Sequence, residues 1–274
     1  MTAPNDHPEL IGQLTEGISN LTSSDEWRRY LDLQSRFHHY SFGNVLLIAA
    51  QSREATRVAG FNSWRKMNRS VCKGEKAIWI LAPMVYKNPT AEGGEEDRVI
   101  RGFKFVPVFD ITQTSGEELA SICNRIEGED PAGHYAQLVT LARSIGFTVD
   151  DHEFGGATNG ECAYDLHRIR VEVTNSPAQR VKTLVHEITH ALLHEGHQNR
   201  ALVELEAEST AYIVCHALGI DSSDYSFGYV ATWAGGSDHA IAGIRASGER
   251  IQKSAAFILQ AFDPAAEEQE ERAA

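Results

Sequence analysis

The sequence predicts an α+β protein with two domains, and three observations lead to that prediction. Helical periodicity dominates residues 25–41 and 43–51. Residues 77–87 and 100–112 are instead rich in aromatic and β-branched side chains, and a polar stretch with Gly and Pro separates them, which is typical of two strands joined by a loop. The chain then returns to helical patterns, and its 274 residues, 42% of them hydrophobic, are enough for two cores.

Changes of composition along the chain place the domain boundaries. An acidic stretch between the two halves is expected to be a linker, and the acidic C-terminal end is too poor in apolar residues to fold. The predicted order is a disordered leader at residues 1–8, an N-terminal domain at 9–115, the linker at 116–133, a second domain at 134–263 and a disordered tail at 264–274.

The second domain is expected to begin with an amphipathic helix over residues 135–147 and a hairpin in the alternating segment 161–173. A long helix follows, with Ser176 as its N-cap and Pro177 at its first position. Gln179 is expected to complete a capping box, in which its side chain reaches back to the N-cap backbone.

A second helix is expected directly after the first. Gly196 gives the first helix a C-terminal stop, and the short loop 196–199 leads into a helical pattern over residues 200–218 that Gly219 closes. Because the loop is short, the two helices are expected to be antiparallel neighbours.

The cysteines and the N-terminal residues bear on the compartment. The first ten residues lack the basic and apolar segments of a signal peptide, and no apolar run approaches the ~20 residues that span a bilayer. The four cysteines are far apart, with no C-x-x-C pair: Cys72, Cys123, Cys162 and Cys215. This spacing argues against a disulfide scaffold or a cysteine zinc site. We therefore expect a cytoplasmic protein with reduced thiols and no membrane segment.

The charge is distributed unevenly. The formal net charge is −13, but residues 27–87 hold eleven Lys and Arg against three Asp and Glu, so that segment is +8 and the rest of the chain is −21. A division this strong predicts two halves with different partners. The alternative is a basic face that the acidic half neutralises.

The segment VHEITHALLHEG, residues 185–196, puts His186, Glu187 and His190 in an otherwise apolar helix. The histidines are four residues apart, so they lie one turn apart on one face, where two neutral imidazoles can bind one zinc ion. Glu187 is rotated by about 100° and can take a proton from water and pass it to a leaving amine. This is the H-E-x-x-H pattern of zinc peptidases. The alternatives are core histidines bonded to backbone carbonyls, and metal binding without catalysis.

Zinc needs a third protein ligand. Three histidines at this spacing would spread over about 12 Å of a straight helix, so His194 is expected to be a helix-end residue that the dipole favours. On the next helix, Glu204 lies at a similar height to His190 and is the candidate ligand. Glu208 shares its face and is placed to hydrogen-bond a ligand histidine, although the two roles could be exchanged. Glu206 points away and is expected to be a solvated charge.

These two helices resemble the ImmA/IrrE metallopeptidases, which are gluzincins of the zincin class. The resemblance rests on HEITH at residues 186–190 and ELEA at residues 204–207. It implies a zincin-like second domain in which Glu204 is the third zinc ligand. The usual Asn after the alanine is Glu208 here, a departure at the position expected to support a ligand.

The chain is also similar to ArdC-type antirestriction proteins. The N-terminal similarity lies in residues 40–51, 56–83 and 108–114, and residues 207–220 extend it to the second domain. The loop 88–97 looks like an insertion. The resemblance implies a single-stranded-DNA-binding domain followed by a metallopeptidase domain, in a protein of mobile elements that resists host restriction or cleaves regulatory proteins.

The basic half fits such a DNA site, which combines a cationic groove with aromatic platforms for bases. Aromatic residues are interleaved with the basic ones, although most of them are needed for the core. Trp64 is the candidate stacking residue. The candidate phosphate contacts are Arg65, Lys66, Arg69, Lys73 and Lys76.

The leading functional hypothesis is a cytoplasmic zinc metalloendopeptidase fused to a single-stranded-DNA-binding domain, with Glu187 as the base and a role in antirestriction or mobile-element regulation. The candidate oxyanion stabilisers are Tyr212, Tyr225, Tyr229 and His239, and the sequence does not choose among them. One alternative is a DNA-binding antirestriction protein whose zinc domain is structural. Another is a regulator whose basic half docks an acidic protein. The protein substrate and the oligomeric state are left open.

Overall fold

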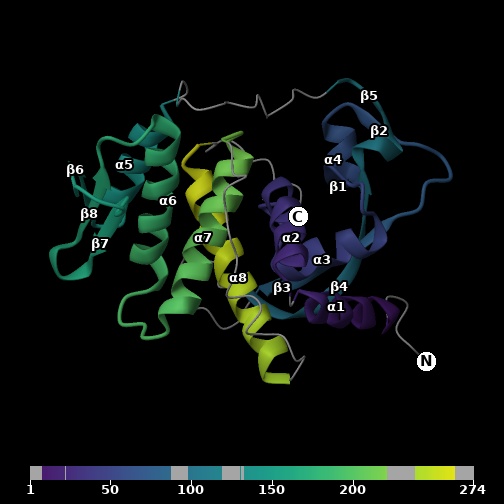
Figure 1. The fold of residues 1–274 in the computed structure, drawn as a ribbon. Coiled ribbons are helices and arrows are strands. Elements are labelled where there is room, and N and C mark those ends of the chain that lie inside the picture. Colours follow the sequence, from purple (N-terminus) through teal and green to yellow (C-terminus); the bar gives the residue numbers. More distant parts are fainter. Residues whose placement is uncertain are drawn as a thin grey trace. The chain divides into compact units, whose positions relative to one another are not determined.

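The computed structural model describes residues 8–21, 23–87, 98–118, 130, 133–220 and 238–262. The chain divides into two compact units, of which unit 1 comprises residues 1–17 and 43–118, and unit 2 comprises residues 18–42 and 119–274. Both units contain helices and strands (Figure 1), which confirms the predicted α+β class. None of the helices in the described ranges offers an apolar stretch that could span a bilayer.

Unit 1 combines two small antiparallel sheets with short helices (Figure 1). The larger sheet has the strand order β1-β4-β3, and the smaller sheet pairs β2 with β5. The elements that lie wholly or mostly in this unit are α1 (Pro8–Asn20), α3 (Phe42–Gln51), β1 (Val58–Gly60), α4 (Phe61–Lys66), β2 (Arg69–Val71), β3 (Ile78–Lys87), β4 (Arg98–Asp110), the 3-10 turn η1 (Ile111–Gln113) and β5 (Thr114–Gly116).

The long hairpin of β3 and β4 is covered by α1 and α3, where Leu10, Leu47 and Phe105 form a buried apolar cluster. Two amides of α3 also bond the edge strand β3. Asn44 exchanges two hydrogen bonds of 2.8 Å with the backbone of Leu81, and Gln51 pairs in the same way with Trp79. Each amide supplies one donor and one acceptor, so the edge is bonded within the unit instead of being offered to another chain.

Unit 2 contains a three-stranded sheet and most of the long helices (Figure 1). In its strand order, β6-β8-β7, the strand β8 is parallel to β6 and antiparallel to β7. The elements are α2 (Ser24–Arg36), α5 (His134–Ser144), β6 (Thr148–His152), β7 (Gly160–Ala163), the 3-10 turn η2 (Tyr164–Leu166), β8 (Arg168–Glu172), α6 (Pro177–Leu193), α7 (Arg200–Ala217) and α8 (Asp238–Gln260).

Helix α7 packs against α2, α6 and α8 (Figure 1). Trp27 of α2 is fully buried, and its Nε1 donates a 2.9 Å hydrogen bond to Ser209 of α7. On α8, a Cβ at Gly248 would lie 2.3 Å from the ring of Phe42, so a larger residue could not stand there without moving that ring. Unit 2 is therefore held together by helices from both ends of the chain.

This packing cuts across the sequence-based division. Residues 9–115 are predicted to form one domain, whereas residues 18–42 pack within unit 2 because the buried face of α2 contacts α7. The other predicted boundaries stay predictions. The predicted tail, most of the predicted linker and leader, and the predicted insertion 88–97 lie outside the described residues, although Pro8 begins α1.

In the predicted second domain, residues 134–263, the helices and strands agree with the sequence patterns, with two omissions. The hairpin predicted in residues 161–173 is β7 and β8, and the predicted helix 135–147 is α5. The omitted elements are β6, whose sequence TVDDH is short and polar, and α8. A signal for α8 was present, because Ile244, Ile251 and Ile258 recur every seven residues and are all fully buried.

Candidate metal centre

The cap of α6 fixes where its histidines fall. Ser176 Oγ accepts from the backbone N–H of Gln179 at 3.3 Å, and Pro177 occupies the first position, as predicted. The predicted capping box is wrong, however, because the Gln179 side chain donates forward to Thr183 and not back to the N-cap. From this start, His186 and His190 come one turn apart on the face of α6 that meets α7.

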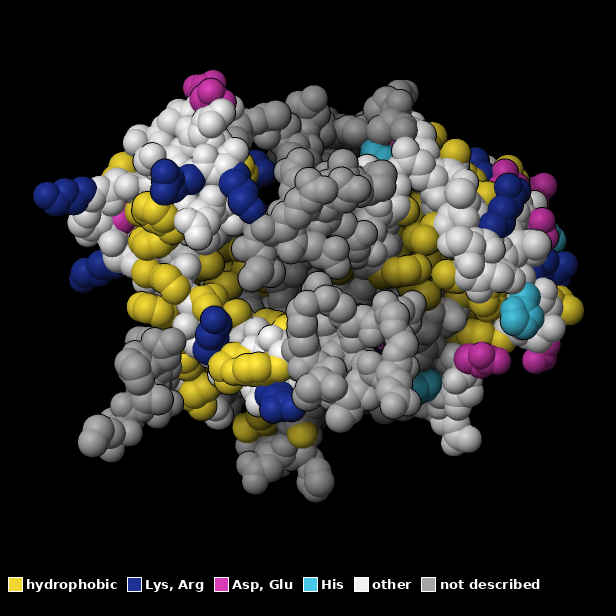
Figure 2. All heavy atoms as spheres, turned by 180° about the vertical axis from the view of Figure 1, so that it is seen from behind, with side chains coloured by type: hydrophobic (Ala, Val, Ile, Leu, Met, Phe, Trp, Pro, Cys, Tyr) yellow, Lys and Arg dark blue, Asp and Glu magenta, His cyan; other side chains and the backbone are white. Residues whose placement is uncertain are grey.

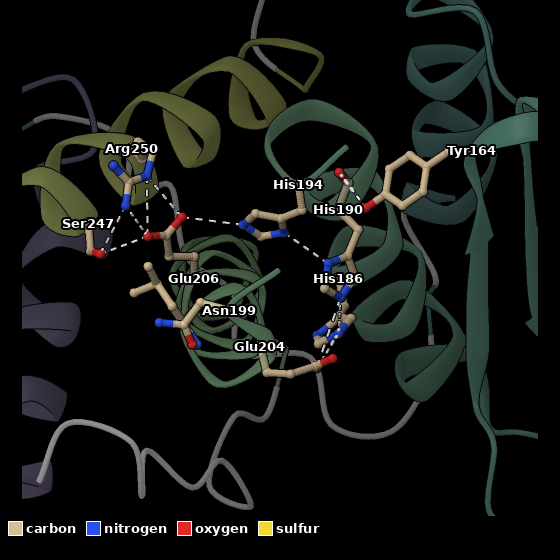
Figure 3. Close-up of polar contacts among 10 residues, drawn as sticks. Tyr164, His186, His190, His194, Asn199, Glu204, Glu206, Ser247 and Arg250 are labelled. Carbon is tan, nitrogen blue, oxygen red and sulfur yellow. Dashed lines mark hydrogen bonds and ion pairs between the residues drawn. The ribbon is translucent and has the colours of Figure 1, made fainter. Parts of the chain in front are cut away.

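Three possible ligand atoms converge between α6 and α7 (Figure 3). The Nε2 atoms of His186 and His190 are 2.9 Å apart. The Oε2 atom of Glu204 lies 3.4 Å from the first and 3.9 Å from the second. Among the residues that the structure describes, these three side chains form the group that could hold a metal ion, with ligand atoms within 4.8 Å of one another.

This donor set fits a divalent cation. Ligands ~2.0–2.1 Å from a zinc ion at tetrahedral angles are about 3.4 Å apart, and the three separations lie on either side of that value. Two imidazoles and one carboxylate leave a fourth position open, as in catalytic zinc sites and unlike closed structural ones. Other divalent transition metals also accept these donors.

The carboxylates of α7 meet the two sides of the His186 ring. Glu204 faces the Nε2 atoms, whereas Oε1 of Glu208, one turn further on, lies 3.7 Å from Nδ1 of His186. The second oxygen of Glu208 is buried without a hydrogen-bond partner. The structure thus brings Glu204 to the ligand position and Glu208 to the outer nitrogen. Because His194 meets Glu206 while His186 meets Glu208, the two helices run antiparallel.

Two of the three candidate ligands, His190 and Glu204, are held in the protonation state that a cation requires, whereas the surroundings of His186 favour its charged form. Burial, together with His186 and His194, lowers the pKa of His190 to about 3, so this ring is neutral. Burial also acts to lower the pKa of His186, but the contact with Glu204 and the nearby carboxylates raises it above the ordinary value. Contact with His186 in turn holds the pKa of Glu204 below its usual range. An ionised carboxylate and a neutral imidazole are the ligating forms.

Glu187 lies against β7 and is 7% exposed. A Cβ on Gly160 would lie 2.8 Å from Oε1 of Glu187 and 2.5 Å from Cγ2 of Thr183, so the close approach of β7 to α6 depends on that glycine. Burial raises the pKa of Glu187 to about 7. The positive charge of His186 opposes this rise, and the negative charge of Glu204 adds to it. A carboxyl group with a pKa near neutrality can both accept and release a proton.

An open pocket of about 500 Å³ adjoins these side chains. One of its walls comes from β7, which pairs with β8 on one side and is an edge of the sheet. The lining residues are Gly160, Cys162, Tyr164, His186, Glu187, His190, His194, His197, Arg200, Val203 and Glu204. The ligand atoms and Glu187 are therefore accessible from one cavity.

Tyr164 is a site residue that the sequence patterns did not identify. Its hydroxyl donates to the carbonyl of His190 at 3.2 Å, and its ring lines the pocket (Figure 3). Burial, with added repulsion from Cys162 and Glu187, raises its pKa above the ordinary value, so the hydroxyl stays a donor. Only the packing of the β7–β8 hairpin on α6 brings this residue to the site.

The four predicted oxyanion stabilisers fare differently. The prediction of Tyr212 as an oxyanion stabiliser is wrong, because the residue is only 5% exposed and its hydroxyl donates to Asp32 of α2. Tyr225, Tyr229 and the side chain of His239 lie outside the described residues, so they stay predictions. Tyr164 is the described tyrosine whose hydroxyl lies beside a candidate ligand.

The prediction that Glu206 is solvated is wrong. It is 2% exposed and accepts from Ser247 at 2.7 Å, from Nε of Arg250 at 3.0 Å and from His194 at 3.3 Å. Burial acts to raise its pKa, but these hydrogen bonds lower it to about 2. The error follows from the unrecognised α8, which covers this face of α7. His194 does end α6, as predicted, but it is buried beside Glu206.

The predicted DNA-binding residues lie in unit 1, on α4, β2 and the turn after β2. Figure 2 shows Lys and Arg side chains on the surface of this unit among hydrophobic ones. Arg69 is already engaged, because it donates to the side chain of Thr114 at 2.8 Å and to the carbonyl of Glu117. The four exposed candidates are Arg65, Lys66, Lys73 and Lys76.

The prediction that Trp64 stacks on a DNA base is wrong. It is fully buried, and its Nε1 donates to the carbonyl of Phe109 at 2.9 Å. It belongs to the core of unit 1 and cannot reach a base. The aromatic side chains that unit 1 does expose are Phe61 at 49%, Tyr86 at 48% and Phe103 at 63%.

The fold and the site together define an α+β chain with an open candidate metal centre of two histidines and one carboxylate. Residues 8–109 match the family model of the N-terminal domain of anti-restriction factor ArdC. This match covers most of the residues on which the ArdC resemblance of the N-terminal half rests, which are 40–51, 56–83 and 108–114.

About four-fifths of the chain is similar to a longer protein and to two solved structures. It is 26% identical to an uncharacterized Bacillus anthracis protein in an alignment 264 positions long, which covers 80% of this chain and 45% of that protein, so the chain spans less than half the relative's length. Two crystal structures of the antirestriction ArdC protein from the R388 plasmid also match. The metal-free one is 21% identical and covers 80% of this chain and 84% of that chain, and the Mn(II)-bound one is 19% identical and covers 81% and 85%, each with a TM-score of 0.49.

The geometry predicts that metal binding depends on both helices. We expect one equivalent of Zn²⁺ per wild-type chain, and at least a hundredfold weaker binding in His186→Ala and in Glu204→Ala, because two ligands seldom retain the ion. Isothermal titration with Zn²⁺ on the metal-stripped chain measures this. His197→Ala is the matched control, since His197 is exposed and lines the same pocket without joining the ligand group. Equal affinity in Glu204→Ala and wild type would remove α7 from the site.

Proposed function

We propose that this chain is a zinc-dependent peptidase whose N-terminal part binds single-stranded DNA, and that it acts in antirestriction. The observation that carries the peptidase proposal is the convergence of three ligand atoms and Glu187 on one open pocket. The match of residues 8–109 to the ArdC N-terminal domain supports the antirestriction part.

The edge strand beside the pocket favours a polypeptide as the substrate. An extended peptide can add to an exposed sheet edge through main-chain hydrogen bonds, and β7 is an edge strand that forms one wall of the cavity. A peptide along β7 would bring one of its carbonyls over His186, His190 and Glu187. A small ligand would not use that edge, so the strand is the feature that points to a protein substrate.

The side chains divide the chemistry among them. His186, His190 and Glu204 would hold the cation, which supplies Lewis-acid activation of the carbonyl and acidifies water. Glu187, with a pKa of about 7, accepts the proton of the attacking water and returns it to the leaving amine. Tyr164 can donate its hydroxyl hydrogen to the oxygen that becomes negative in the transition state. Its present acceptor is the backbone carbonyl of His190, a residue that also lines the pocket.

Glu187→Gln should separate binding from catalysis. The amide keeps the shape but cannot accept a proton, so we expect unchanged Zn²⁺ content and a kcat reduced by about 10²-fold to 10⁴-fold. The assay is cleavage of a denatured protein mixture by the full-length chain, with metal content measured on the same samples. Glu195→Gln is the matched control, because Glu195 is exposed and follows the same helix. Cleavage at the wild-type rate in Glu187→Gln would rule out this mechanism, and metal binding without cleavage in wild type would favour a structural zinc domain.

Tyr164→Phe tests the oxyanion role. It removes only the hydroxyl, so we expect kcat to fall by about 10²-fold with little change in KM, because the bond is made in the transition state. Steady-state kinetics on a peptide that the wild type cleaves would show this division. Tyr212→Phe is the comparison, since the Tyr212 hydroxyl is bonded to Asp32 and should affect stability more than kcat. A change confined to KM in Tyr164→Phe would assign the residue to substrate binding instead.

The surface of unit 1 supports the DNA part of the proposal. The exposed Phe61 and the exposed Arg65 and Lys66 all belong to α4, so an aromatic face and two cations come from one short helix. The turn after β2 adds Lys73 and Lys76. Stacking on an aromatic ring combined with backbone neutralisation is how single strands are bound without sequence preference.

The combined Ala variant of Arg65, Lys66, Lys73 and Lys76 should weaken single-strand binding and its salt dependence. Each lost phosphate contact lowers the slope of log K against log salt by about 0.7. Phe61→Ala should instead weaken binding without changing that slope. Fluorescence anisotropy with a labelled oligonucleotide at several salt concentrations measures both effects. Lys253→Ala, an exposed change on α8, is the control. An unchanged slope in the combined variant would place the DNA elsewhere.

A further inference from the structure

A chain of buried polar side chains leads from α8 to the candidate ligand His190 (Figure 3). His194 Nδ1 lies 2.8 Å from His190 Nδ1, and His194 Nε2 lies 3.3 Å from Oε2 of Glu206. Glu206 also accepts from Ser247 and Arg250 of α8. His194 is 4% exposed and Glu206 2%, so water does not replace these contacts.

One arrangement of protons satisfies every contact in this chain when both rings are neutral. Arg250 can only donate, so Glu206 is the acceptor and the hydrogen on His194 lies on Nε2. Nδ1 of His194 is then an acceptor, and the 2.8 Å contact requires the hydrogen of His190 to lie on Nδ1. That leaves Nε2 of His190 without a hydrogen. This tautomer is assigned from the network.

The assigned tautomer is the one a metal ligand needs, because the free Nε2 of His190 is the atom that faces His186 and Glu204. The opposite tautomer would put the hydrogen of His190 on Nε2, its candidate ligand atom. The Nδ1 atoms of His190 and His194 would then both be acceptors and could not form the hydrogen bond between them. Partners on the outer nitrogen of a metal-bound histidine fix its ring and typically contribute 10-fold to 100-fold to metal affinity. Here that partner is a second histidine, which the buried carboxylate of Glu206 orients in turn.

We propose that Glu206 is a positioning residue that acts through His194 to hold His190 in the metal-binding tautomer, with Arg250 and Ser247 as its anchor on α8. This rests on the proposed metal site. It couples the placement of α8 to metal affinity, although no residue of α8 belongs to the ligand group of the described residues. Glu206 itself lies on α7 two residues after the candidate ligand Glu204, so one helix supplies both a ligand for the ion and the support for another.

The experiment measures Zn²⁺ affinity of the full-length chain by competition titration. We expect Glu206→Gln and His194→Leu to bind about 10-fold to 100-fold more weakly than wild type. His194→Asn should bind more tightly than His194→Leu, because its amide oxygen can still accept from His190. Ser209→Ala is the matched control: it removes a buried hydrogen bond to Trp27 from the same helix, so it should lower stability and leave metal affinity unchanged.

A second readout reports the tautomer directly. Imidazole nitrogen NMR of the metal-free wild-type chain should show the hydrogen of His190 on Nδ1, and Co²⁺ bound to Glu206→Gln should give an altered visible absorption spectrum. Metal binding in wild type with unchanged affinity in Glu206→Gln and His194→Leu would overturn the inference while the metal site stands. A hydrogen on Nε2 of His190 would overturn it too. Absence of Zn²⁺ binding in wild type would instead overturn the proposed function and this inference with it.

Discussion

The approach of Glu204 on α7 to the Nε2 atoms of His186 and His190 on α6 is the contact on which the candidate site depends. Three acceptor atoms within 4.8 Å of one another is a costly arrangement unless a hydrogen or a cation lies between them. Helices α6 and α7 pack against each other, and their apolar residues Leu184, Ile188 and Ile213 are completely buried. The caps at Ser176 and Asn199 set where each helix begins, and hence the register in which the two meet.

The surroundings of this contact offset the cost of burying charge. Glu206 and Arg250 form an ion pair in which the carboxylate is almost fully buried, and such pairs are favourable only when further hydrogen bonds satisfy the remaining oxygens. Ser247 and His194 supply those bonds. The carboxylate of Glu206 thus accepts hydrogen bonds from α8 and also contacts His194, which in turn contacts the candidate ligand His190. The same side chains of unit 2 therefore both stabilise the helix packing and support the candidate site.

The organisation of unit 2 bears on how the two proposed activities share one chain. Residues 8–109 match one family domain, yet residues 18–42 within that match pack with the metal-site unit through Trp27 and Asp32. A cut between residues 115 and 134 would therefore remove α2 from α7 and expose its buried face. The units defined by packing and the segment defined by family similarity therefore have different boundaries, and α2 belongs with α7 by packing.

Local patterns in the sequence by themselves determined many of the elements, among them α6 and α7, and the first part of the site. Four-residue spacing puts His186 and His190 on one face of any helix, and the capping residue Ser176 marks where α6 begins, so both follow from short-range geometry. Only the tertiary structure decided what lies opposite a side chain. Trp64 became core, Tyr212 turned to Asp32, Glu206 was buried under α8, and the β7–β8 hairpin brought Tyr164 to the pocket. The surroundings of each of these side chains depend on an element that is distant in the chain, and the periodicity of one segment does not predict which other segment will cover it.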